Sequence, residues 1–213
     1  MTAGLEVLDV RRRRPAHTPK PLPGPVRPPR ASPESPKPPV PAAPVRPDPE
    51  GPGVDVHATL AALFEAAGAR HRFLAHPPEG RTDVASELRG HPLDRAAKSL
   101  VLRVAFGKRQ RQYVLAVVPG HRRVDLDAVA DLLGGTGAAF ASRAVAERLT
   151  GAVSGAIAPF DLASGELEIL VDEELTAHGE IFFNTGRLDM SAALAVCDYL
   201  SLARPSVARI AQR

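Results

Sequence analysis

The sequence contains one cysteine, no tryptophan and only 4% aromatic residues among its 213 amino acids. The single cysteine, Cys197, excludes an intramolecular disulfide framework and a zinc site built on several cysteines. It follows an apolar Ala-Leu-Ala-Val run and is predicted to be a small core residue. No apolar run approaches the roughly 18 residues of a transmembrane helix. The charged start is not followed by an apolar segment, so no signal peptide is recognised and a cytoplasmic location without membrane contact is expected.

Proline is abundant only at the N-terminus. Of the 22 prolines, 16 lie in residues 1–53, which also contain four consecutive arginines, Arg11 to Arg14. Proline fixes φ and removes backbone donors, so this segment is predicted to be a disordered, partly polyproline II tail. It is either a weak arm that attracts RNA or docks on a protein, or a dispensable extension. Residues 54–213 are predicted to form one globular domain.

Charge is distributed unevenly within that domain. Residues 70–123 contain 12 basic and 4 acidic residues, whereas residues 124–213 contain 6 basic and 13 acidic residues. Such an asymmetry favours an anionic partner for one face of the domain. Scattered solvated arginines remain the alternative interpretation.

Periodicity predicts an α+β domain in which short helices surround a mixed, largely antiparallel sheet or partial barrel. The runs 99–106 and 113–118 are rich in β-branched residues, and Gly107 to Arg111 join them as a hairpin with a basic tip. Helices are expected at 54–67, 82–88, 125–133, 142–149 and 198–203, and further strands at 72–75, 167–171, 180–183 and 188–190.

Several common catalytic motifs are missing. Ser154 is not central in its glycine loop, which excludes a G-x-S-x-G nucleophile elbow, and residues 135–140 lack the third glycine of a dinucleotide fingerprint. That segment is instead predicted to be a helix end and a turn. No phosphate-binding loop is present, and the seven histidines lack the spacing of a zinc site. No cofactor and no metal are therefore expected.

Three features remain as candidates for chemistry. Lys98 is one of two lysines after residue 53, and a compact ammonium can contact a carbonyl or phosphate oxygen where an arginine would not fit. In the glycine loop, residues 151–160, Gly155 and Pro159 bound a G-x-x-x-P motif whose free N–H groups can face a developing oxyanion. Asn184 and Gly186 follow a predicted strand. An ordinary lysine at a strand end and two structural turns would use the same residues.

Taken together, these segments resemble a known family. The ordered set consists of His76-Pro-Pro-Glu-Gly-Arg-Thr82, Ala97-Lys98-Ser-Leu-Val-Leu, Val117-Val-Pro-Gly120, Thr150 to Phe160, Val171-Asp172 and Phe183-Asn-Thr-Gly186. It is similar to the YbaK/prolyl-tRNA-synthetase-associated editing domain over residues 54–211, and Phe183 to Ser191 look closest to its free-standing YeaK-like branch.

The resemblance implies a trans-acting deacylase that hydrolyses the ester between a small wrong amino acid, such as serine, alanine, cysteine or threonine, and the terminal adenosine of tRNA. Water would attack with help from a hydroxyl of the tRNA, so no protein nucleophile is needed. Lys98 and Gly155 are implied at the scissile ester. The substrate-binding residues implied are His76, Thr82, Gly151, Ser154, Ala156, Ile157, Pro159, Asn184 and Gly186.

The basic segment would then face the acceptor end of the tRNA, through Lys108, Arg109, Arg111, Arg122 and Arg123. An aminoacyl-tRNA synthetase is a further possible partner. Two alternatives stay open: a module that binds aminoacyl-tRNA or a synthetase without hydrolysis, and an enzyme that hydrolyses an unrelated small ester.

Overall fold

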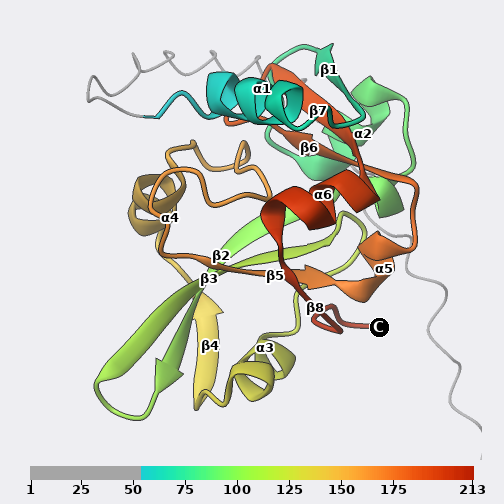
Figure 1. Cartoon of the computed structure of the whole chain (residues 1–213). Coiled ribbons are helices and arrows are strands. Elements are labelled where there is room, and N and C mark those ends of the chain that lie inside the picture. The colour runs from blue at the N-terminus through green and yellow to red at the C-terminus, as the bar shows by residue number, and fades with distance from the viewer. Residues whose placement is uncertain (1–53) are drawn as a thin grey trace, which may run out of the picture. The chain divides into compact units, whose positions relative to one another are not determined.

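The computed structural model describes residues 54–213 (Figure 1). The tail predicted for residues 1–53 lies outside the described residues. The elements follow in the order α1 (Val56–Ala66), β1 (His71–Ala75), α2 (Thr82–Arg89), the 3₁₀ turn η1 (Leu93–Arg95), β2 (Ala97–Phe106), β3 (Gln110–Pro119), α3 (Leu126–Leu133), β4 (Gly137–Phe140), α4 (Arg143–Thr150), β5 (Glu168–Asp172), α5 (Glu173–Thr176), β6 (Glu180–Asn184), β7 (Met190–Ala195), α6 (Val196–Ala203) and β8 (Ser206–Ala208). None of the helices in this part of the chain is long and apolar enough to cross a membrane.

The strands form two sheets. The larger has the order β4-β2-β3-β5-β8, with antiparallel pairing from β4 to β3 and parallel pairing from β3 to β8. The smaller has the order β1-β7-β6 and is entirely antiparallel. A single bridge between Ala96 and Phe182 brings the start of β2 beside β6, so the two sheets meet at this point. The described residues show no closed barrel, and the predicted α+β class with mixed sheets is confirmed.

Apolar clusters cover both faces of the larger sheet. Successive side chains of a strand point to opposite faces. Val101 and Leu115 therefore join the cluster shared with α1 and the smaller sheet, while Leu102 and Val114 join the cluster under α3. This two-sided burial explains why β2 and β3 are apolar over most of their length.

Helix α1 closes the first cluster. Val56, Leu60 and Phe64 recur at helical spacing and are buried against the sheets, as the periodicity predicted. The Asp55 carboxylate accepts the backbone N–H of Ala58 at 3.0 Å, which satisfies one of the free donors at the start of the helix. Figure 1 shows α1 lying over the smaller sheet.

Three predictions were wrong, and packing between distant segments explains each of them. The strand expected at 188–190 begins at Met190 and continues to Ala195, and the turn expected at 135–140 contains β4. Both segments are rich in alanine, which has low β-propensity, and they become strands because partners pair beside them. Cys197 is exposed, because α6 buries Val196 and Tyr199 on its other face.

The packing of α1 makes a testable prediction. Leu60→Ala removes a fully buried side chain and should lower the free energy of unfolding by about 2–5 kcal/mol. Leu132→Ala on α3 is the matched control, because Leu132 is 48% exposed and its truncation should cost less than about 0.5 kcal/mol. Urea unfolding of both variants measures the difference. Equal losses would contradict the assigned core.

Candidate active site

A cavity of about 200 Å³ opens where the two sheets meet. Strand β4 pairs only with residues 102–105 of β2, so the edge of β2 at residues 97–100 is left free of β4 and forms one wall. The other walls come from one face of α2 with the residues before it, the glycine loop and the end of β6. The lining residues are Gly80, Arg81, Thr82, Ala85, Arg89, Ala97, Lys98, Ser99, Leu100, Gly155, Ile157, Phe182, Phe183 and Asn184.

Asn184 ties these walls together. Its amide nitrogen donates to the carbonyl oxygens of Gly155 at 2.8 Å and Glu79 at 3.2 Å, and its amide oxygen accepts from the Ser191 hydroxyl at 2.8 Å. Two carbonyl acceptors require the NH₂ group on that side, so the orientation of the amide is fixed. One side chain thus holds the segment before α2, the glycine loop and β7.

Ser191 extends this network to two basic side chains. Its fully buried hydroxyl lies 2.7 Å from His76 Nε2 and accepts from Arg89 Nη1 at 3.1 Å. The other ring nitrogen of His76 lies 2.8 Å from the carbonyl oxygen of Pro77, which fixes the ring. His76 therefore contacts Ser191 outside the cavity, and neither residue is part of its lining.

Arg89 is a cation without a carboxylate partner among residues 54–213. Its Nε donates to the carbonyl oxygen of Ala85 at 2.7 Å, and no ion pair to it is found in the described structure. Burial lowers the pKa of Arg89 to about 10, which leaves the guanidinium charged at neutral pH. Sequence reasoning missed Arg89. The available signal was helical spacing, because Thr82, Ala85 and Arg89 share one face of α2.

The glycine loop approaches the segment before α2 backbone to backbone. Gly155 has φ +93°, and a Cβ there would lie 2.9 Å from the Cα of Gly80. The loop is also fixed by Glu147 on α4, whose carboxylate accepts the Ser154 N–H at 2.9 Å. This hydrogen bond and the one from Arg143 lower the pKa of Glu147.

Within the loop, Ala156 N–H donates to the carbonyl oxygen of Val153 at 2.9 Å, and its own carbonyl accepts the Gly186 N–H at 2.9 Å. The backbone N–H groups of Gly155 and Ile157, which both line the cavity, have no acceptor in the described part of the chain. They are therefore backbone donors of the cavity-lining residues that the described structure leaves unused.

Lys98 lies between the cavity and an open groove. Its ammonium donates to the carbonyl oxygens of Arg122, at 2.5 Å, and Gly120, at 3.3 Å, in the turn after β3. Burial, and secondarily the nearby charge of Arg123, lower the pKa of Lys98. The groove beyond it includes Arg123 and the exposed ring of Phe140.

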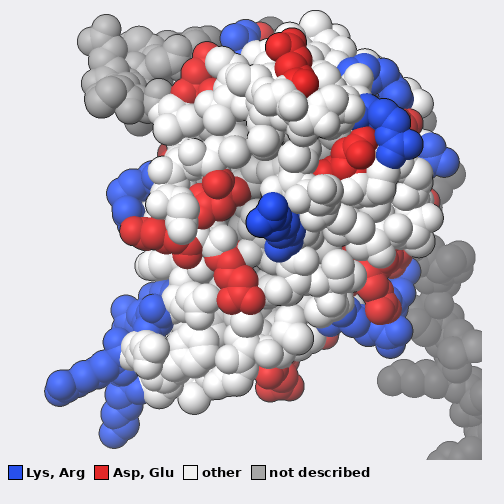
Figure 2. Space-filling model, in the orientation of Figure 1, with Lys and Arg blue, Asp and Glu red and all other residues white. Residues whose placement is uncertain are grey.

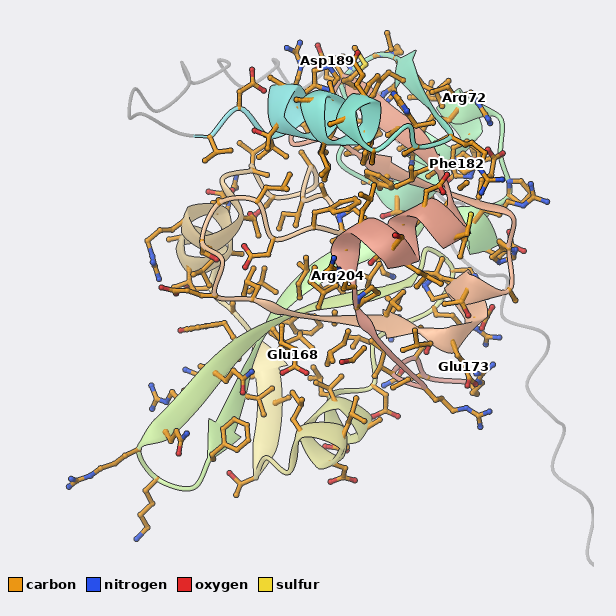
Figure 3. All side chains as sticks on the ribbon, in the orientation of Figure 1. Arg72, Glu168, Glu173, Phe182, Asp189 and Arg204 are labelled. Atoms are coloured by element: carbon orange, nitrogen blue, oxygen red, sulfur yellow. The ribbon has the colours of Figure 1, made fainter. Side chains whose placement is uncertain are left out.

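Phe182 forms an apolar wall that is supported from outside. The His91 ring stacks on it at 3.8 Å between centroids, and the Arg72 guanidinium lies 5.5 Å from its centroid (Figure 3). Burial is the main cause that lowers the pKa of His91, which favours the neutral, stacking ring.

The structure brings together only part of the predicted set. Lys98, Gly155, Thr82, Ile157 and Asn184 line the cavity. The others support the glycine loop or its neighbours: Gly151 ends α4 with φ +67°, Ser154 binds Glu147, Ala156 and Pro159 are buried, and Gly186 packs on α1.

The residues predicted to contact RNA lie at opposite ends of the β2–β3 hairpin. Figure 2 shows basic side chains projecting from the hairpin tip, where the sequence has Lys108 and Arg109. The last residue of β2 before the tip, Phe106, is about 26 Å from Lys98, for eight residues at roughly 3.3 Å each. Arg122 and Arg123 lie at the cavity end, where Arg122 also binds Glu174 at 3.1 Å.

With this geometry established, the chain is found to match the model of the aminoacyl-tRNA editing domain over residues 76–202, and it belongs to that family. Proteins of Escherichia coli K12 and O157:H7, each named multifunctional Ser/Thr-tRNA deacylase ProXp-y, are both 38% identical to it over 156 residues, which cover 73% of this chain and 92% of theirs.

Solved structures share the fold. A hypothetical protein, APE2540, superposes with a TM-score of 0.65 at 19% identity and covers 72% of this chain and 99% of its own. A candidate trans-editing enzyme for prolyl tRNA synthetase superposes with a TM-score of 0.63 at 22% identity, covering 74% and 98%.

The close approach at Gly155 predicts a large effect of one added methyl group. Gly155→Ala meets both an unfavourable positive φ and the backbone of Gly80, whereas Gly165→Ala meets only a positive φ of +67° in open space. Both should destabilise, and Gly155→Ala by at least about 1 kcal/mol more. Thermal unfolding compares them, and equal shifts would show that the glycine loop does not need this contact.

Proposed function

We propose that the protein hydrolyses the ester bond of mischarged aminoacyl-tRNA and thereby proofreads a small amino acid. The observation that carries the proposal is the cavity, which offers backbone donors and two cations, Arg89 and Lys98, that have no carboxylate partner among residues 54–213. It is smaller than the roughly 300 Å³ of pockets for drug-sized ligands. A single aminoacyl ester is a ligand of suitable size. Membership of the editing family and the deacylase name of the Escherichia coli relatives support the same reaction.

The donors of the glycine loop account for the chemistry. The oxygen of a water molecule attacks the ester carbonyl carbon, the bond to the ribose oxygen breaks, and that oxygen takes up a proton, which releases free amino acid and tRNA. The N–H groups of Gly155 and Ile157 stabilise the oxyanion that develops during attack. One donor of this kind contributes roughly 100- to 1000-fold in rate.

Cations in and beside the cavity support the same step. Arg89 lines the cavity without a carboxylate partner among residues 54–213, and Lys98 forms its edge. Positive charge in a partly desolvated site favours a developing oxyanion more strongly than it would in water. An activated ester needs little more than positioning and such electrostatic stabilisation, and a hydroxyl of the tRNA can assist the water.

The names of the relatives narrow the choice of the amino acid that we propose the protein removes from tRNA. They are named Ser/Thr-tRNA deacylases, so serine and threonine are the members of the small set that we propose first. We further propose that residues 54–213 form the deacylase domain, and that it acts in the cytoplasm with the acceptor end of tRNA as its partner. A synthetase that presents the substrate is consistent with the trans-editing description of the structural neighbour.

Lys98 provides the first test. Release of amino acid from tRNA charged with serine, threonine, alanine, cysteine or proline is followed at saturating enzyme. Lys98→Ala should lower the rate of release by about 100-fold, because a cation at the edge of the ester site is lost. Lys108→Ala, at the far end of the same hairpin, should leave the rate unchanged.

The wild type must release at least one of these amino acids. If the folded protein binds tRNA but releases none of them, it is a binding module and not a deacylase. Activity on small esters that is independent of the RNA body would instead identify an unrelated esterase.

The cavity end of the hairpin provides a second test, of RNA contact. Arg123→Glu should weaken tRNA binding and reduce the slope of log affinity against log salt by about one, because one phosphate contact is lost. Arg109→Glu measures the same two quantities, tRNA affinity and its salt dependence, for a residue at the hairpin tip. Binding titrations at several salt concentrations measure both slopes, and two unchanged slopes would place the RNA on another face.

A further inference from the structure

Ser99 presents an uncommitted hydroxyl to the cavity. It follows Lys98 on β2, and because neighbouring strand residues point to opposite faces, its side chain lies on the face of Ala97 and Val101. Its Oγ is buried and has no hydrogen-bond partner in the described structure. Ser99 also lines the cavity, so the orphan hydroxyl borders the empty space.

The other orphan polar atoms do not share this position. Within residues 54–213 they are His91 Nε2, Asp94 Oδ1, His178 Nε2 and Tyr199 Oη, and none of these residues lines the cavity. In the ligand-free protein, a buried hydroxyl without a hydrogen-bond partner lowers the stability of the fold. Because this hydroxyl lies in the wall of the proposed active site, we expect a group of the ligand to supply the missing hydrogen bond.

The polar neighbours of Ser99 in the site are already engaged. The Asn184 amide binds two carbonyls and Ser191, and the Lys98 ammonium binds the turn after β3. The remaining free groups are N–H donors of Arg89 and of the glycine loop, and the hydroxyl of Thr82, whose oxygen is not among the buried unpaired atoms of the described residues. Ser99 therefore supplies the one buried hydroxyl oxygen without a partner on the described cavity wall, and a hydroxyl can both donate and accept.

We propose that Ser99 is the specificity-determining residue that hydrogen-bonds the side-chain hydroxyl of the amino acid to be removed. This inference rests on the proposed deacylase function. A seryl or threonyl group brings a hydroxyl that satisfies Ser99 Oγ, whereas an alanyl group leaves that oxygen buried and unpaired. Sites that hydrogen-bond a substrate hydroxyl reject analogues without it far more strongly than apolar pockets reject a missing methylene.

The test uses stable amide analogues of the charged tRNA end, 3′-seryl-amino and 3′-alanyl-amino 3′-deoxyadenosine. Calorimetric titration of the full chain should show that the wild type binds the seryl analogue at least about tenfold more tightly than the alanyl analogue. Ser99→Ala should weaken the seryl analogue until the two bind within about twofold of each other, and should leave the alanyl affinity unchanged. Ser99→Thr retains the hydroxyl and should retain the preference for the seryl analogue.

Stability separates recognition from a structural role. Because Ser99 Oγ makes no bond in the described structure, Ser99→Ala should unfold at the same temperature as the wild type or higher. A marked loss of stability, or an equal weakening of both analogues, would overturn the proposal and assign Ser99 to the framework of β2.

Hydrolysis assays on the same variants keep the two proposals distinguishable. If ester hydrolysis is observed but the ratio of seryl to alanyl release is the same in the wild type and in Ser99→Ala, the role of Ser99 fails and the deacylase function stands. If the analogue preference depends on Ser99 while no charged tRNA is hydrolysed, recognition stands and the deacylase function fails.

Discussion

The site depends on the amide of Asn184. Its three hydrogen bonds join the carbonyls of Gly155 and Glu79 to the hydroxyl of Ser191, so three segments distant in the sequence share one rigid centre. The Gly155 backbone to which Asn184 donates has φ +93° and approaches the backbone of Gly80 closely. Backbone donors fixed in this way need no reorganisation when charge develops, which is the basis of their catalytic effect.

The electrostatics of the site follow from the same arrangement. Arg89 reaches Ser191 from α2, and Lys98 is held by carbonyls of the turn after β3, so both cations are positioned by neutral oxygen atoms and not by carboxylates among the described residues. Burial lowers the pKa values of both side chains. Among the described residues the cavity lining contains these cations, and the serine–histidine pair of Ser191 and His76 lies outside it. Such a lining suits attack by water on an activated ester.

Local patterns predicted much of the fold and part of the site. The hairpin, α1 and the glycine loop were predictable because turns, helical spacing and apolar runs act over a few residues. Arg89, Ser191 and Ser99 were not identified as site residues, because their positions depend on tertiary packing, as in the contact between Arg89 and Ser191, 102 residues apart. Strand β7 was misplaced for the same reason, since its small residues form a strand only between β1 and β6.

The proposed deacylase requires the cavity between the two sheets to hold the aminoacyl ester. A crystal structure of the full chain with 3′-seryl-amino-3′-deoxyadenosine is the most direct test. We expect the seryl group to lie between Ser99 and the glycine loop, with its carbonyl oxygen within hydrogen-bond distance of the Gly155 or Ile157 N–H. An analogue bound instead in the basic depression around Arg70, Arg72 and Arg95, with the cavity empty, would contradict it.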